Sequence, residues 1–164
     1  MIDDQLADGR FPVYAPCENT VNQHAAPGWA DVGLLMPWRI YEMYGDKRVL
    51  ERAYSACQKW IDYVKANNPD GIWRNARGND FGEWLNGDTL VLDGYPVGNN
   101  EMNKVMFATA FHYLSSATMV KIAETLGKSE DAETYREYAE HVRNAYRSTY
   151  VRPDGTLTQE TQAG

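Results

Sequence analysis

The 164-residue chain has few cysteines, and the two it has do not form a recognisable pair. Cys17 lies in a proline-flanked stretch, whereas Cys57 falls on the apolar face of a predicted helix. Such unrelated settings indicate neither a disulfide framework nor a thiolate metal site. We expect Cys57 to be a small buried hydrophobic residue.

Runs of positive charge and long apolar stretches are also missing. The 23 acidic and 16 basic residues give a net charge of −7, so we expect no nucleic-acid partner. No segment approaches the roughly 18 consecutive apolar residues of a membrane span, so no membrane partner is expected either. Residues 1–5 lack the basic and then apolar pattern of a signal peptide, which favours the cytoplasm over export.

The composition that remains is that of an ordinary globular region. Apolar residues make up 43% of the chain and charged residues 24%, and the length suits a single core. Residues 1–27 are rich in turn formers without a sustained period, which predicts an extended or loop segment.

Residues 31–67 carry the pattern of a first helical hairpin. Its first stripe ends near Gly45, and Asp46 is expected to cap the second helix. The apolar residues recur at helical spacing: Val32, Leu35, Met36, Ile40 and Met43, then Leu50, Ala53, Cys57, Trp60, Ile61 and Val64.

Residues 102–150 predict a second helical hairpin. Its first helix carries two apolar stripes, so we expect burial on two sides. One consists of Met106, Ala110, Tyr113, Ala117 and Val120, and the other of Phe107, Phe111, Leu114, Thr118 and Ile122. After Gly127, Ser129 is expected to cap a helix with one apolar stripe, which predicts one-sided burial. The fold class predicted is therefore all-α, built from stacked antiparallel helical hairpins. A closed ring of hairpins needs several more pairs than this chain supplies, whereas an open solenoid could end anywhere. The chain shows no internal repeat at a fixed period, which disfavours the solenoid.

Two segments combine a large ring with a carboxylate beside a glycine. Trp29 and Asp31 follow Gly28, while Glu83 and Trp84 follow Gly82 in a long, aromatic-rich loop over residues 69–100. Loops of that length either line a site or are disordered, and the aromatic content of this one favours a site. Indole faces stack on the C–H groups of a sugar and carboxylates accept hydrogen bonds from its hydroxyls, so the pattern indicates carbohydrate binding. The alternative is that both tryptophans belong to the core.

No cofactor or metal site is indicated by the remaining polar residues. His24 and His112 have no partner at metal-ligand spacing, and we expect a surface histidine and a helix-face histidine.

The chain resembles the middle of the catalytic domain of bacterial α-L-rhamnosidases. The resemblance rests on residues 27–31, Pro37, Trp38, Tyr41, residues 44–46, Leu50, Glu51, Tyr54, Trp60, Tyr63, residues 81–85, residues 108–110, residues 123–127 and residues 159–162. It implies part of an (α/α)₆ barrel and hydrolysis of terminal α-linked rhamnose with inversion. It also implies that Trp29 and Trp84 line the rhamnose pocket. The family usually has Asp where this chain has Glu83.

These considerations give a set of candidate residues. The substrate-binding candidates are Trp29, Trp84, Asp80 and Glu83, and the in-chain catalytic candidates are Glu83 and Asp31. Asp31 precedes a periodic stripe, so we expect it to cap that helix rather than to react.

The resemblance places the family's general acid and general base outside the matched region. Inverting glycosidases need both. We therefore expect a catalytic-domain fragment that binds a rhamnose-containing glycoside but is inactive alone. Its open apolar helix faces should be covered in a homo-oligomer. The alternatives are a non-catalytic carbohydrate-binding module and a helical scaffold in which both tryptophans are buried.

Overall fold

The computed structural model describes residues 1–17, 23–83 and 103–159. Within these ranges the regular elements are four helices, and the only β pairing is two isolated bridges, Pro12 with His24 and Val151 with Leu157. The helices are α1 (Val32–Tyr44), α2 (Arg48–Asn67), α3 (Lys104–Thr125) and α4 (Ser129–Tyr150). The predicted all-α class is confirmed for the described part of the chain.

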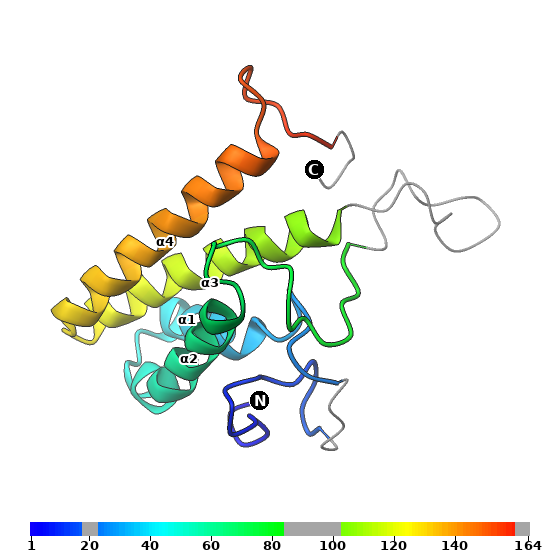
Figure 1. Cartoon of the computed structure of the whole chain (residues 1–164). Coiled ribbons are helices and arrows are strands. Elements are labelled where there is room, and N and C mark those ends of the chain that lie inside the picture. Colours follow the sequence, from blue (N-terminus) through cyan, green and yellow to red (C-terminus); the bar gives the residue numbers. More distant parts are fainter. Residues whose placement is uncertain (18–22, 84–102, 160–164) are drawn as a thin grey trace.

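The helices form two successive pairs (Figure 1). The long helices α3 and α4 run antiparallel, and α1 and α2 lie together against one side of α3. Gly45 ends α1 in the left-handed conformation, with φ of 69°, and its N–H donates to the Tyr41 carbonyl at 2.8 Å. A glycine adopts this conformation without steric cost, so the turn into α2 is tight.

Two predicted caps are displaced by one residue. The N-cap of α2 is Lys47 rather than Asp46, although the Asp46 carboxylate still accepts a hydrogen bond from the Arg48 N–H at 3.0 Å. Ser129 is the first residue of α4, and Lys128 is the N-cap. By contrast, the Asn103 side chain caps α3 directly, since it accepts from the N–H groups of Val105 and Met106.

The core forms where α2 and α4 face α3. Trp60 and Cys57 are fully buried on α2, as their spacing predicted. Burial is one-sided on α4, where the buried residues are Ala132, Tyr135, Tyr138, Ala139, Val142 and Tyr150. The Tyr54 hydroxyl also donates to the Asp131 carboxylate at 2.6 Å, which links α2 to α4.

The buried face of α3 is more polar than the sequence predicted. Phe107 and Phe111 are only half-buried and Leu114 is 45% exposed, so the expected burial of two apolar stripes is wrong for this part of the chain. Five polar residues are buried instead: Thr109, His112, Ser115, Ser116 and Thr118. Each of the five has a hydrogen-bond partner, which removes most of the cost of burying it.

Several apolar side chains of α1 face solvent. Met36 is 51% exposed and Met43 is 74% exposed. Association of copies through such faces stays a prediction.

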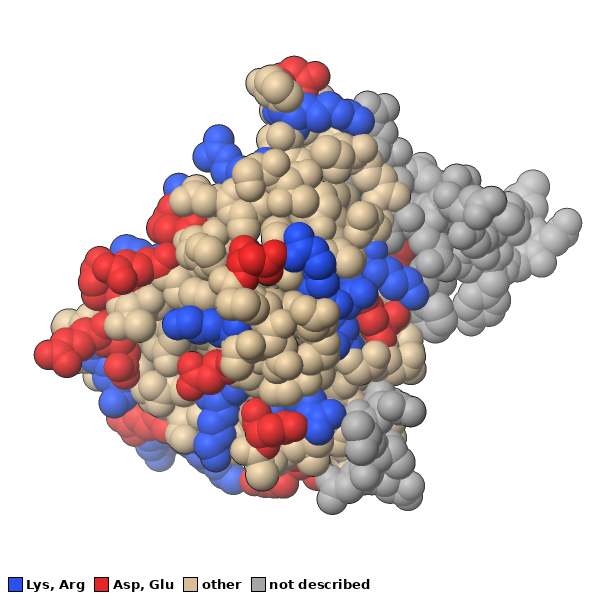
Figure 2. All heavy atoms as spheres, viewed as in Figure 1, with Lys and Arg blue, Asp and Glu red and all other residues tan. Residues whose placement is uncertain are grey.

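Figure 2 shows acidic and basic side chains interspersed on the face in view. None of the helices in the described ranges is long and apolar enough to cross a membrane.

We predict that His112 makes the stability of the chain depend on pH. Burial, helped by the electrostatic interaction with His141, lowers the pKa of His112 from 6.5 to about 3, so the folded protein keeps the ring neutral. Between these values only the unfolded chain binds the proton. The free energy of unfolding should therefore fall with decreasing pH, by up to about 1.4 kcal/mol per pH unit from this group.

Urea unfolding of His112→Gln at pH 7, 6, 5 and 4 measures this effect, because glutamine cannot take up the proton. The variant should lose less stability than the wild type as the pH falls. His141→Gln, at an exposed position, should keep most of the wild-type pH dependence, because burial is the larger cause of the low pKa of His112. A His112→Gln variant with the same pH dependence as the wild type would contradict the assignment.

Candidate functional site

Two segments far apart in the sequence meet near the N-terminal end of α3. They are the turn formed by residues 24–31 and the loop formed by residues 76–83. A Cβ atom at Gly78 would lie 1.8 Å from the His24 carbonyl oxygen, so the two backbones are in direct contact. His24 is fully buried here, and its expected surface position is wrong because this loop covers it.

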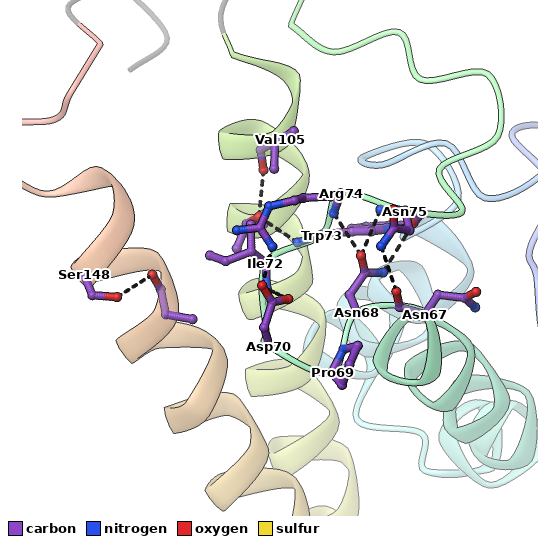
Figure 3. A network of polar contacts seen from close by, with 12 residues as sticks. Asn67, Asn68, Pro69, Asp70, Ile72, Trp73, Arg74, Asn75, Val105 and Ser148 are labelled. Atoms are coloured by element: carbon purple, nitrogen blue, oxygen red, sulfur yellow. Dashed lines mark hydrogen bonds and ion pairs between the residues drawn. The ribbon is translucent and has the colours of Figure 1, made fainter.

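The path of the chain beyond α2 is set by the buried side chain of Asn68 (Figure 3). Its carbonyl oxygen accepts from the N–H groups of Arg74 and Asn75, each at 2.9 Å, and its amide donates to the Val64 carbonyl at 3.0 Å. One side chain thus satisfies backbone groups on both sides of the turn, which fixes the direction in which the loop leaves the helix.

Trp73 then attaches this loop to α3. Its backbone N–H donates to the Thr109 hydroxyl at 3.0 Å, and that hydroxyl donates to the Val105 carbonyl at 2.7 Å. The Trp73 ring is fully buried. These contacts place residues 76–83 beside the first turns of α3.

Aromatic rings from both segments gather at this meeting point. The rings of Trp29 and Phe81 have centroids 4.9 Å apart and are tilted by 48°. Gly28 lies against α3, since a Cβ atom there would approach the Phe107 ring to 3.2 Å and the Phe111 ring to 3.6 Å. Trp29, Phe81, Phe107 and Phe111 are all half-buried, and we call them the aromatic cluster.

Asp80 lies beside Phe81 in a charged setting. Its carboxylate pairs with Arg77 at 2.7 Å and accepts from the Gly82 N–H at 3.0 Å, while its backbone carbonyl accepts from the Lys104 ammonium at 3.1 Å. The Asp80 side chain is 10% exposed. Burial raises the pKa of Asp80, and the charges of Arg77 and Lys104 oppose that rise.

The other candidates of this loop lie at the edge of the described residues. Glu83 is half-buried. Trp84 lies outside the described residues. Phe81 is the ring that meets Trp29 among the described residues.

Asp31 is the N-cap residue of α1, as its position predicted, but its side chain does not bond to that helix. It is fully buried, and its side chain makes no cap hydrogen bond to α1. Its carboxylate instead accepts from the Gly28 N–H at 2.8 Å, the Trp60 indole N–H at 3.1 Å and the Ser115 hydroxyl at 2.6 Å. Burial raises the pKa of Asp31, and these three hydrogen bonds oppose the rise.

Backbone strain coincides with the same two segments. Ala25, with φ of 64°, and Ala76, with φ of 57°, are the non-glycine residues in the described ranges that have positive φ. Such conformations cost free energy and often occur at functional sites. The strain therefore supports the meeting point of the two segments as the candidate site.

Sequence reasoning missed the contribution of α3 to the site. Phe107 and Phe111 were assigned to an apolar stripe, and Ser115 had no local pattern to mark it. Two adjacent serines within an otherwise apolar helix were the available signal.

Among the described residues no group of three or more His, Cys, Asp and Glu side chains is placed to hold a metal ion.

Comparisons with known proteins add a family and a fold. The model of the bacterial alpha-L-rhamnosidase 6 hairpin glycosidase domain matches residues 1–164. An α-L-rhamnosidase from Streptomyces avermitilis is 34% identical over 161 residues, which cover 98% of this chain and 14% of that protein. An α-L-rhamnosidase from Formosa agariphila is 31% identical over 164 residues, covering 96% of this chain and 16% of that protein.

The structural likeness extends over almost the same region. The crystal structure of the Streptomyces avermitilis α-L-rhamnosidase complexed with L-rhamnose matches with a TM-score of 0.82 at 29% identity, covering 98% of this chain and 14% of that chain. The four helices therefore form part of a six-hairpin α/α toroid, as predicted. The chain spans only 14–16% of the length of these relatives.

We predict that the contact between the two segments makes Gly78 sensitive to substitution. Gly78→Ala should destabilise the chain because its Cβ atom would collide with the His24 carbonyl oxygen. Gly127→Ala is the matched control, since Gly127 also has positive φ but has no atom within 4 Å of the added Cβ. Urea unfolding should show a loss for Gly78→Ala that is larger by about 1–3 kcal/mol. Equal losses would mean that residues 76–83 do not pack on His24.

Proposed function

The chain belongs to the family of bacterial α-L-rhamnosidase six-hairpin glycosidase domains, and on this premise we propose that its aromatic cluster binds the sugar ring of an α-L-rhamnoside. The observation that carries the proposal is the pair of half-buried rings, Trp29 and Phe81, which come from separate segments and meet at 4.9 Å.

The chemistry of the cluster suits a neutral deoxysugar. Rhamnose has an apolar methyl group and C–H groups that pack on aromatic faces, and its hydroxyls need hydrogen-bond acceptors. Because the Trp29 and Phe81 rings are tilted by 48° rather than stacked flat, part of each face stays available. Asp80 and Glu83 are the nearby carboxylates that we propose as acceptors.

The exposure of the Trp29 ring distinguishes the sugar-binding proposal from a role as a helical scaffold. A scaffold role requires the ring to be buried in the core, whereas Trp29 is half-buried. Trp60 and Trp73, by contrast, are fully buried. Half-burial of an indole beside a loop is typical of binding surfaces.

We also propose that the 164-residue chain alone does not hydrolyse rhamnosides. An inverting glycosidase needs an acid and a base, with carboxyl groups typically about 6.5–9.5 Å apart. Of the acids that the sequence singled out, Asp31 is fully buried and Asp80 is paired with Arg77. Asp80 can still accept a hydrogen bond from a hydroxyl, but among these candidates Glu83 has no second carboxylate that is both exposed and outside an ion pair to act as the other acid or base.

We predict that Trp29→Ala weakens the binding of L-rhamnose by about tenfold, since one stacking face is lost. Isothermal titration calorimetry or chemical-shift titration with L-rhamnose measures the affinity. Trp38→Ala is the matched control, because Trp38 is also a half-buried tryptophan but lies on α1 against Tyr41. Equal effects of the two substitutions, or no binding by the wild type, would contradict the proposed site.

A turnover assay tests the second part of the proposal. We expect the purified chain to release no aryl alcohol from an aryl α-L-rhamnoside above the uncatalysed rate. Glu83→Gln distinguishes the outcomes. Turnover by the wild type that disappears in Glu83→Gln would contradict the prediction and would make Glu83 catalytic.

A further inference from the structure

We propose that Asp31 is a positioning residue that holds Trp29 in the orientation needed to stack on the sugar. The inference rests on the proposed function, because it assigns the buried carboxylate a role in that same site. Asp31 is also the N-cap residue of α1, but its side chain bonds to other parts of the chain and not to that helix.

The carboxylate joins three parts of the chain that are distant in sequence. One oxygen accepts from the Gly28 N–H, and the other accepts from the Trp60 indole N–H and the Ser115 hydroxyl. Trp60 lies 29 positions from Asp31, and Ser115 lies 84 positions from it. The turn before α1 is thereby attached to α2 and α3 at a single point.

The burial and the partners of this carboxylate indicate that it positions the turn and does not react with the sugar. Asp31 is 0% exposed, so a sugar at the aromatic cluster cannot touch it. Its three hydrogen-bond partners, Gly28, Trp60 and Ser115, are all neutral donors. A buried carboxylate that accepts several hydrogen bonds is well ordered, because losing any one of them leaves charge unsatisfied.

Trp29 lies between Gly28 and Asp31, the two residues that the carboxylate hydrogen bond joins. Gly28, which donates to Asp31, has φ of 83° and lies against the rings of Phe107 and Phe111. On the other side, the Ala30 N–H donates to the Ala26 carbonyl at 2.9 Å. Movement of the carboxylate therefore moves the backbone on both sides of Trp29, and with it the ring that meets Phe81.

Two neighbouring serines allow a controlled experiment. Ser115 and Ser116 are both fully buried on α3, but only the Ser115 hydroxyl donates to Asp31, whereas the Ser116 hydroxyl donates to the His112 carbonyl of its own helix. Ser115→Ala and Ser116→Ala therefore remove the same atom at the same depth. Only the first removes a contact of the carboxylate.

The full chain is labelled with 5-fluorotryptophan, and the Trp29 resonance is assigned from Trp29→Phe. Without sugar, Ser115→Ala should shift or broaden the fluorine resonance of Trp29, whereas Ser116→Ala should leave it unchanged. With L-rhamnose as the probe, Ser115→Ala should bind about three- to tenfold more weakly, as expected for the loss of one hydrogen bond. Ser116→Ala should bind like the wild type.

A second variant covers the case in which Ser115→Ala does not fold. Trp60→Phe removes the indole donor to the same carboxylate oxygen and keeps an aromatic ring in the core. It should perturb the Trp29 resonance as Ser115→Ala does. A Trp29 resonance that is unchanged in the variants that fold, or is perturbed equally by Ser116→Ala, would overturn the inference. If the wild type does not respond to L-rhamnose, the proposed function fails, while the sugar-free spectra still decide the role of Asp31.

Discussion

The arrangement of the site depends on one buried carboxylate. Burying a charged group is costly unless hydrogen bonds replace its hydration, and Asp31 receives three of them from three different parts of the chain. Because each donor comes from another segment, the carboxylate can be satisfied only when the turn before α1, helix α2 and helix α3 are in their native positions. The free energy that orders the carboxylate therefore also orders the turn that carries Trp29.

The loop that faces this turn is fixed by comparable means. Asn68 satisfies backbone groups on both sides of the bend that follows α2, and Trp73 attaches the next residues to Thr109 on α3. As a result the loop that carries Asp80 and Phe81 leaves α2 in a fixed direction, and Phe81 meets Trp29. Binding residues on loops that a rigid helical frame positions are common in enzymes, and this chain belongs to a glycosidase-domain family.

The sequence predicted local structure better than it predicted side-chain partners. Helical spacing located the buried residues of α2, such as Cys57 and Trp60, because periodicity reports directly which face of a helix packs. It could not report that Trp60 donates to Asp31, or that Ser115 does so from 84 positions away. The cap position of Asp31 was predicted, but its side-chain partners were missed for the same reason, since a local pattern describes only local partners. Trp84, the other predicted ring, lies outside the described residues.

Hydrogen exchange of the Gly28 amide tests the central claim most directly. An N–H that donates to a buried carboxylate should exchange as slowly as the core amides of α2 and α3, because it opens only when that carboxylate loses its partners. We expect such protection in the wild type and faster exchange in Ser115→Ala. Exchange of the wild-type Gly28 amide at the rate of an exposed turn would mean that Asp31 does not hold the turn that carries Trp29.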